Sequence, residues 1–339
     1  MKSSLKTMGV LSILYMILLS VFLCACGGHG GGGGDGPAGI SYTGVTTPAA
    51  IDENNAQDLA IGAYQGGSTA GSAGGAAGGL GAVQTDGTEG TSSPRTLKLS
   101  RVLEDSLRRV DLMSRSGGIS LGAVYEETDT VYGDCGGSAS YTITVDDVNG
   151  EFSGRFNYDD YCSQGVTLSG RVSFSGEVDV ATGDILTFTF SFNNLTATSG
   201  SDSFTLRGDI SYDVNDSSIS VSMDMLLKDN NTGKVYWARD CTMTWIEGAG
   251  YVEFEWSGRY YDPDEGYVVV STNTPFVIYD GDDWPSEGVL VIKGDTGSEG
   301  GITKARLTVL SSTTFQVEAD TDGDGSYDWD SGVLYWSDF

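Results

Sequence analysis

A short acidic loop near the C-terminus has the residue types and the spacing of a calcium ligand set. Asp320, Asp322, Asp324 and Asp328 stand at loop positions 1, 3, 5 and 9, with glycine at position 6. Calcium takes hard oxygen ligands, and this spacing is the first part of the pattern used by EF-hand-like loops. The twelfth position, normally a bidentate Glu, is Ser331. Two interpretations stay open: a weak calcium site, and a solvated Asp-Gly hairpin turn between two strands.

A cysteine near the N-terminus offers a second chemistry, covalent lipidation. Lys2 and Lys6 precede an uncharged apolar stretch, Met8–Leu23, which is the organisation of a cleaved secretory signal. The run Leu23-Cys24-Ala25-Cys26 resembles the lipobox of bacterial lipoproteins, in which a small residue precedes the modified cysteine. The resemblance implies that residues 1–25 are a signal peptide and that Cys26 carries diacylglycerol and an N-acyl chain such as palmitate. The alternative is an uncleaved transmembrane helix, but these 16 residues fall short of the ~20 that span a bilayer.

The residue after the anchor bears on location. In the sorting rule of enteric bacteria, Asp at that position favours the inner membrane, and this chain has Gly27. We therefore expect the chain in the outer membrane, on its periplasmic face or at the cell surface.

The remaining cysteines would lie in an oxidising compartment, where disulfides persist. If Asn149-Gly150 is a two-residue hairpin turn, Cys135 and Cys162 lie one diagonal step apart, which predicts a disulfide between them. Cys241 shares the parity of Val235, Trp237, Met243 and Trp245 in its strand. It is predicted to be a buried free thiol, because the only histidine of the chain, His29, lies in a flexible segment and cannot activate it.

The net charge limits the partners. The 339 residues include 18 basic and 47 acidic side chains, a formal charge of −29 at pH 7, and loss of the signal peptide would leave about −31. Such a field repels phosphate backbones and anionic headgroups, so we expect no nucleic-acid binding and no attachment to membranes by charge. A lipid anchor is then the expected membrane contact, and cations and basic partners stay open.

The N-terminal part of the mature chain divides by composition. Residues 26–50 hold the anchor and a flexible tether, since nine of the 13 residues in Gly27–Gly39 are glycine. Residues 51–64 predict a short helix that Asp52 can cap. Residues 65–95, rich in Gly, Ser, Ala and Thr, predict a disordered linker.

Residues 96–118 predict an amphipathic helix. Apolar side chains within Leu97–Ser114 form one stripe, made of Leu99, Val102, Leu103, Leu107, Val110 and Met113. We expect this helix to pack on the main domain, and a free surface helix that grips a partner or lipid is the alternative.

Residues 119–339 change to a period of two, which predicts antiparallel β-strands with one buried face. Turn signals such as Asn149-Gly150 and the run Asn230-Asn231-Thr232-Gly233 separate consecutive strands and favour a meander. Glycines such as Gly154, Gly170 and Gly208 recur at inward positions, where glycine lets a large sheet bend. The expected fold is therefore an all-β main domain, a large antiparallel meander with a strongly curved or barrel-like sheet, plus one or two short N-terminal helices.

The C-terminal half also carries a resemblance. The runs Gly266–Thr272, Pro285–Val291 and Ala305–Thr308, followed by the Asp-Gly loop and Trp336, look like the same region of uncharacterised β-rich lipoproteins of Gram-negative bacteria. The resemblance covers residues 120–339. It implies an envelope location and brings no activity with it.

These features lead us to expect a lipid-anchored envelope protein, not an enzyme, whose β domain binds a partner or ligand or serves structurally. Two alternatives stay open. One is a carrier of a lipid or other apolar ligand in the curled sheet, which continuous large apolar residues on its concave face would favour. The other is a carboxylate-based glycoside hydrolase, for which acids are available at Glu253, Glu255, Asp262, Asp264 and Glu265.

Overall fold

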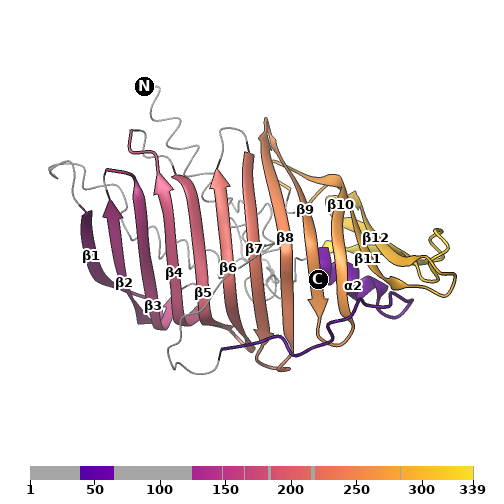
Figure 1. Ribbon diagram of the computed structural model, residues 1–339, viewed down its shortest axis with the longest axis horizontal. Helices are drawn as coiled ribbons and strands as arrows, with labels where there is room; N and C mark the ends of the chain where they lie inside the picture. The colour runs from indigo at the N-terminus through magenta and orange to yellow at the C-terminus, as the bar shows by residue number, and fades with distance from the viewer. Residues whose placement is uncertain are drawn as a thin grey trace.

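One antiparallel sheet dominates the part of the chain that the computed structural model describes, which is residues 39–64, 124–146, 148–163, 165–181, 185–214, 218–282 and 284–338. Its 14 strands follow one another in sequence order, so each strand pairs with the next (Figure 1). The prediction of an all-β antiparallel meander is confirmed. The sheet curls strongly, with β1 and β14 at its two ends, and does not close into a barrel.

The strands are β1 (Val124–Tyr132), β2 (Gly136–Asp146), β3 (Glu151–Ser163), β4 (Val166–Val178), β5 (Ile185–Ser199), β6 (Asp202–Val214), β7 (Ser218–Asp229), β8 (Val235–Gly248), β9 (Tyr251–Asp262), β10 (Gly266–Tyr279), β11 (Glu287–Thr296), β12 (Ile302–Ser311), β13 (Thr314–Asp320) and β14 (Trp329–Tyr335). An α-helix, α2 (Ala56–Tyr64), precedes them, and a 3₁₀ turn, η2 (Trp336–Asp338), follows.

One of the expected N-terminal helices is present among the described residues. Asp52 Oδ1 accepts the backbone N–H groups of Asn54 and Asn55, at 2.7 and 3.1 Å, so Asp52 caps as predicted, although the helix itself begins only at Ala56. The signal peptide, Cys26, most of the tether, the linker 65–95 and the predicted helix 96–118 lie outside the described residues. None of the helices in the described ranges is long and apolar enough to cross a membrane.

The two faces of the sheet differ in chemistry. Residues paired directly across strands lie on the same face, and the register links Ile143, Gly154, Phe174, Phe190 and Ile210 from β2 to β6. The register carries this inner face on through β7–β10. On the same face, α2 packs over β9–β13. The opposite, outer face of β2–β7 is rich in Ser, Thr and charged side chains. Alternation along each strand therefore separates an apolar face from a polar one.

A line of irregular pairings crosses the sheet where it bends. Asp160, Asn194 and Asp240 have positive φ angles of 48°, 56° and 53°, and each lies at a register shift, in β3, β5 and β8 respectively. Gly208 lies beside this line on β6, where an added Cβ would come within 1.9 Å of the Asp224 carbonyl oxygen. Bulges increase local twist and bend a strand, so these positions account for part of the curl, and the predicted close approach at an inward glycine is confirmed.

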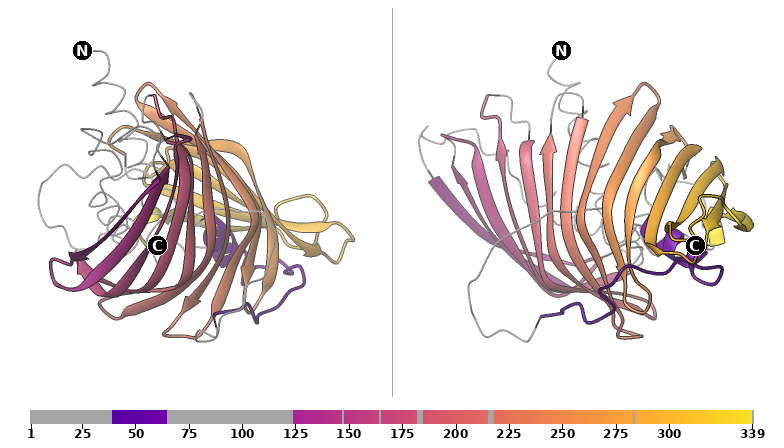
Figure 2. Two further views of the ribbon diagram at one scale, coloured as in Figure 1. Left: turned by 60° about the vertical axis from the view of Figure 1, so that its left-hand side comes forward. Right: turned by 45° about the vertical axis from the view of Figure 1, so that its right-hand side comes forward.

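A strap of residues, Ile40–Ala49, joins the tether to α2. The Ile40 amide donates to Asn194 Oδ1 (3.1 Å), and the Tyr42 hydroxyl donates to the Asp262 carbonyl (2.9 Å). Near its end, the strap exchanges backbone hydrogen bonds with Tyr267 on β10. Figure 2 shows this indigo strap running outside the curl, near one end of the strands, before α2 enters the curl. The strap is therefore bound from β5 to β10.

The cysteine predictions are confirmed, although the register behind one of them is wrong. Cys135 and Cys162 form a disulfide, and Cys241 is buried and free. The β2–β3 pairing places Val145 opposite Phe152, so the loop is longer than the predicted Asn149-Gly150 turn and the pairing is offset by two. A bulge before Cys162 then shifts the register back by one, which brings the sulfurs together.

The predicted parity of β8 is also wrong at the two positions before the bulge, Val235 and Trp237. Trp237 was expected on the face of Cys241, but the bulge at Asp240 reverses the alternation. Trp237 therefore points outward, where its indole donates to Asp224 (2.6 Å) and stacks on Tyr261 with ring centroids 4.9 Å apart.

Candidate functional site

The acidic loop predicted as a calcium site connects β13 to β14. Asp320 is the last residue of β13 and lies directly opposite Lys304 of β12. Its carboxylate is buried and accepts the backbone N–H groups of Gly323 (2.8 Å) and Gly325 (2.9 Å). These bonds wrap the loop around the carboxylate, so Asp320 acts as the organising residue of the turn.

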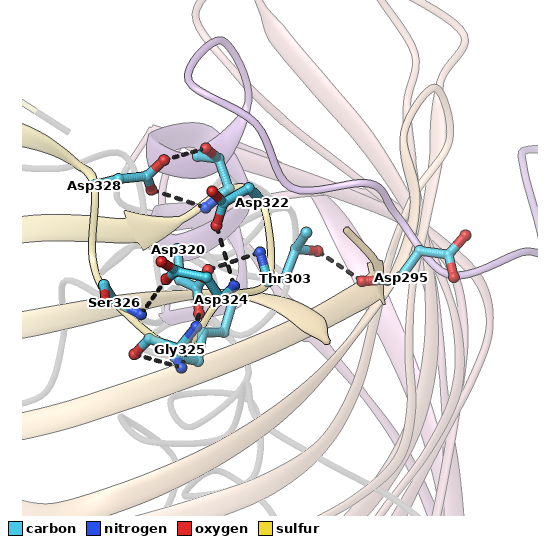
Figure 3. A network of polar contacts seen from close by, with 11 residues as sticks. Asp295, Thr303, Asp320, Asp322, Asp324, Gly325, Ser326 and Asp328 are labelled. Carbon is cyan, nitrogen blue, oxygen red and sulfur yellow. Dashed lines mark hydrogen bonds and ion pairs between the residues drawn. The ribbon is translucent and has the colours of Figure 1, made fainter. Parts of the chain in front are cut away.

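Three of the four predicted ligands come together. One carboxylate oxygen from each of Asp320, Asp322 and Asp324 lies within 4.8 Å of the other two. We call this group the aspartate cluster (Figure 3). Asp322 and Asp324 also accept backbone N–H groups within the loop, from Asp324 (3.1 Å) and Ser326 (2.6 Å).

The other two predicted positions do not join the cluster. Asp328 accepts the amide and the hydroxyl of Thr321, at 2.9 and 2.8 Å, and so closes the base of the loop. Ser331, at the twelfth position, lies in β14, where its hydroxyl accepts the Val317 amide (3.0 Å) and donates to the Gly332 carbonyl (2.8 Å). The loop therefore follows the first half of the calcium pattern and departs from the second half.

A lysine that sequence spacing did not reveal neutralises the buried carboxylate. Lys304 Nζ lies 2.9 Å from Asp320 Oδ2 and 3.3 Å from the Gly325 carbonyl oxygen. Desolvation alone would raise the pKa of Asp320. The Lys304 ammonium and the Gly323 and Gly325 amides have a larger, opposite effect, so the pKa of Asp320 lies below its ordinary value. The pKa of Asp328 is lowered as well, because Thr321 donates to it.

A tyrosine holds the basic side chains of β12 over the loop. The Lys304 Nζ and the Arg306 Cζ lie 5.3 and 4.3 Å from the ring centroid of Tyr327, and Arg306 also binds Glu318 at 2.6 Å. An added cation would have to share Asp320 with a fixed ammonium. The residues present fit a calcium ion only weakly, and calcium binding stays a prediction.

Three of the five acids considered for a hydrolase, Asp262, Asp264 and Glu265, have contacts at the β9–β10 turn. Asp262 Oδ1 accepts the backbone N–H groups of Asp264 (2.8 Å) and Glu265 (3.1 Å) and so shapes the β9–β10 turn. Asp264 pairs with Lys234 (2.5 Å), and Glu265 accepts the amide of Asn55 (2.8 Å). Burial raises the pKa of Asp262. Glu253 and Glu255 lie on β9, away from this turn in the strand.

The outer face of β1–β5 contains two open grooves of about 500 and about 660 Å³. Short hydroxyl side chains from successive strands line both grooves. Thr144, Ser153 and Ser175 line both grooves, Thr142 and Ser173 line the larger one, and Thr189 lines the smaller one. Titratable groups also line them, namely Asp146, Glu151 and Glu177 in the smaller groove and Glu126 and Arg155 in the larger one.

No protein-family model, no curated protein and no solved structure matches this chain.

Sequence reasoning did not find Lys304, since it stands 16 residues before Asp320 in no recognisable motif. A signal does exist. The short connection between Ser311 and Thr314 would have placed Lys304 within one residue of Asp320, and the register shift between Val309 and Ser311 brings the two directly opposite each other.

Proposed function

We propose that the protein is a lipid-anchored protein of the bacterial envelope whose β domain is non-catalytic and acts by binding. The observation that supports this proposal most directly is the strap. A glycine-rich tether leads from Cys26 to Gly39, and the chain is bound to the outer side of the sheet from Ile40 onward.

The length of the tether sets the distance between the domain and the lipid. A random-coil chain of thirteen residues, the number in Gly27–Gly39, has an end-to-end distance of roughly 20 Å, and this is the span that we propose. A domain held at that distance keeps its polar outer face accessible, and the net charge of about −31 that remains after loss of residues 1–25 disfavours close contact with anionic headgroups. Outer-membrane attachment through Cys26, with a protein or ligand partner at the outer face, is the arrangement that we propose.

Palmitate labelling tests the anchor. Cys26→Ser should leave an unprocessed precursor without label, because thioether formation needs that sulfur. Cys24→Ser is the matched control, since Cys24 would be removed with the signal peptide, and it should label like the wild type and fractionate with the outer membrane. Equal labelling of Cys26→Ser would overturn the anchor assignment.

A carrier of a lipid or other apolar ligand is the second candidate, favoured by one observation. Large apolar side chains form a continuous series on the inner face, with Phe152, Phe174 and Phe188 in ring contact across β3–β5. This candidate requires that a ligand, and not protein, covers the inner face of β2–β8.

A further inference from the structure

The inner face of β2–β8 needs a second layer. Val172, Ile210 and Met223 are 0 to 1% exposed, and Phe174 and Phe190 are 2 to 3% exposed. A single sheet leaves the ends of its side chains open, and domains bury such a face under another element. Contacts along the sheet, such as the Phe174–Phe188 ring pair, cover only the flanks of these side chains. A covering element is therefore required.

The helix that the structure describes covers a different part of the sheet. α2 packs on β9–β13, where Tyr64 contacts Phe276 and Trp336 with ring centroids 5.0 and 4.8 Å apart. Gly62 approaches Tyr260 of β9 closely enough that a Cβ would lie 2.8 Å from its hydroxyl. α2 therefore seals the C-terminal half of the inner face.

We propose that the amphipathic segment Leu97–Ser114 lies on the inner face of β2–β8 as a helix and completes the core there. The inference goes beyond the proposed function and does not depend on the lipid anchor. It makes this face part of the hydrophobic core, so the face is not a ligand cavity.

The path of the chain supports this occupant. α2 ends at Tyr64, buried on the inner side, and β1 begins at Val124 at the far end of the sheet. Residues 65–123 must therefore pass from β10 to β1, across about nine strand spacings, or roughly 43 Å. The nine residues after Ser114 reach at most ~32 Å from it, which keeps Leu97–Ser114 near the first strands.

The size and pattern of the segment also match. Eighteen helical residues are about 27 Å long, and the six spacings from β2 to β8 are about 29 Å wide. The apolar stripe that includes Leu103 and Leu107 would meet the apolar inner face, and Arg101 and Arg108 would point to water. A segment on the same chain has an effective concentration far above that of a free ligand, which favours it over a lipid or a second copy.

Photo-crosslinking of the detergent-solubilised full chain tests the proposal. Leu103→benzoylphenylalanine should crosslink to peptides within residues 139–243, on side chains of the inner face such as Phe190 and Met223. Arg108→benzoylphenylalanine is the matched control on the opposite side of the same helix and should give no such product. Crosslinks from Leu103 only to other regions, equal products from both positions, or a dimeric product would overturn the proposal.

Melting temperatures of two double variants test the proposal independently of the crosslinking probe. Leu103→Ser/Leu107→Ser should lower the melting temperature by about 10 °C, because two buried leucines are lost, whereas Arg101→Ser/Arg108→Ser should change it by less than about 2 °C. Equal melting of both double variants would contradict the inference. Native mass spectrometry of the wild-type chain should show the protein mass plus its anchor alone, and a retained additional lipid would establish the carrier instead.

Discussion

Replacement of Lys304 by methionine should lower the free energy of unfolding by about 2 kcal/mol at pH 7. Removal of one partner from a buried ion pair costs ~3–5 kcal/mol, whereas an exposed pair contributes less than ~1 kcal/mol. The Asp320 side chain is 1% exposed and the Lys304 side chain 25% exposed, which places this pair between the two cases. Two backbone N–H groups still bind Asp320 in the variant, so the loss should stay below that of a fully buried pair.

The dependence on pH follows from the direction of the pKa shift. Asp320 has a lowered pKa in the folded state, so its contribution is present above the unfolded pKa of about 4 and is lost as the pH falls through the folded pKa. Lys304→Met removes the ammonium that lowers this pKa. The difference in stability between wild type and variant should therefore narrow below about pH 4.

Urea denaturation at pH 7 and at pH 3.5 measures both effects, with Lys293→Met as the matched control. Lys293 is exposed on β11 and pairs directly with Lys304 in the sheet, so the control removes the same charge from the neighbouring strand. An equal loss in both variants, or a difference that does not change with pH, would refute the reasoning about Asp320.

The Lys304→Met variant also tests calcium binding by the aspartate cluster. Without the Lys304 ammonium, the aspartate cluster has less neutralising charge, so millimolar calcium should raise the melting temperature of Lys304→Met more than that of the wild type. Affinity should be weak, about 10⁻⁴ to 10⁻³ M, magnesium should substitute poorly, and Asp322→Asn/Asp324→Asn should abolish the shift. No shift in either protein would leave the loop as an acidic hairpin turn.

Two further predictions concern the covalent and steric constraints of the sheet. Serine at both Cys135 and Cys162 should lower the free energy of unfolding by about 3 kcal/mol, because the bridge closes a loop with a sequence separation of 27; urea denaturation measures the loss, and a loss below about 1 kcal/mol would contradict the loop-entropy argument. Gly208→Ala should destabilise by more than about 2 kcal/mol, because its Cβ would clash with the Asp224 carbonyl at a φ of 138°. Gly233→Ala has positive φ but no atom within 4 Å, and an equal loss there would show that backbone strain alone explains the effect.

Much of the fold could be predicted because each strand carries its own signal. Alternation such as Phe188, Phe190 and Phe192 gives the strand and its buried face, and short turns between consecutive strands give the meander. The register could not be predicted with the same accuracy. The bulges at Asp160 and Asp240 shift the pairing by one residue without a sequence pattern that distinguishes them from their neighbours, and this is why Trp237 lies on the face opposite to the predicted one.

The candidate site divides in the same way. Local spacing predicted that Asp320, Asp322 and Asp324 would share a loop, and the structure brings them together. The partner of Asp320 is supplied by another strand, so its identification required the β12–β13 register. Asp328 has the predicted spacing but binds Thr321 instead of joining the aspartate cluster. Its short side chain forms hydrogen bonds with nearby groups of its own turn more readily than with distant ones.

Residues 40–64 belong to the β domain in physical terms, although those up to residue 50 were predicted as part of a flexible tether. α2 contributes seven buried residues to the core over β9–β13, and the strap adds hydrogen bonds from Asn194 to Tyr267. Removal of residues 1–95 would expose that part of the inner face and remove the hydrogen bonds between the strap and the sheet. A truncated chain suited to measurement should therefore start at residues 27–38, since that choice removes the expected anchor and keeps the strap and α2 with the sheet.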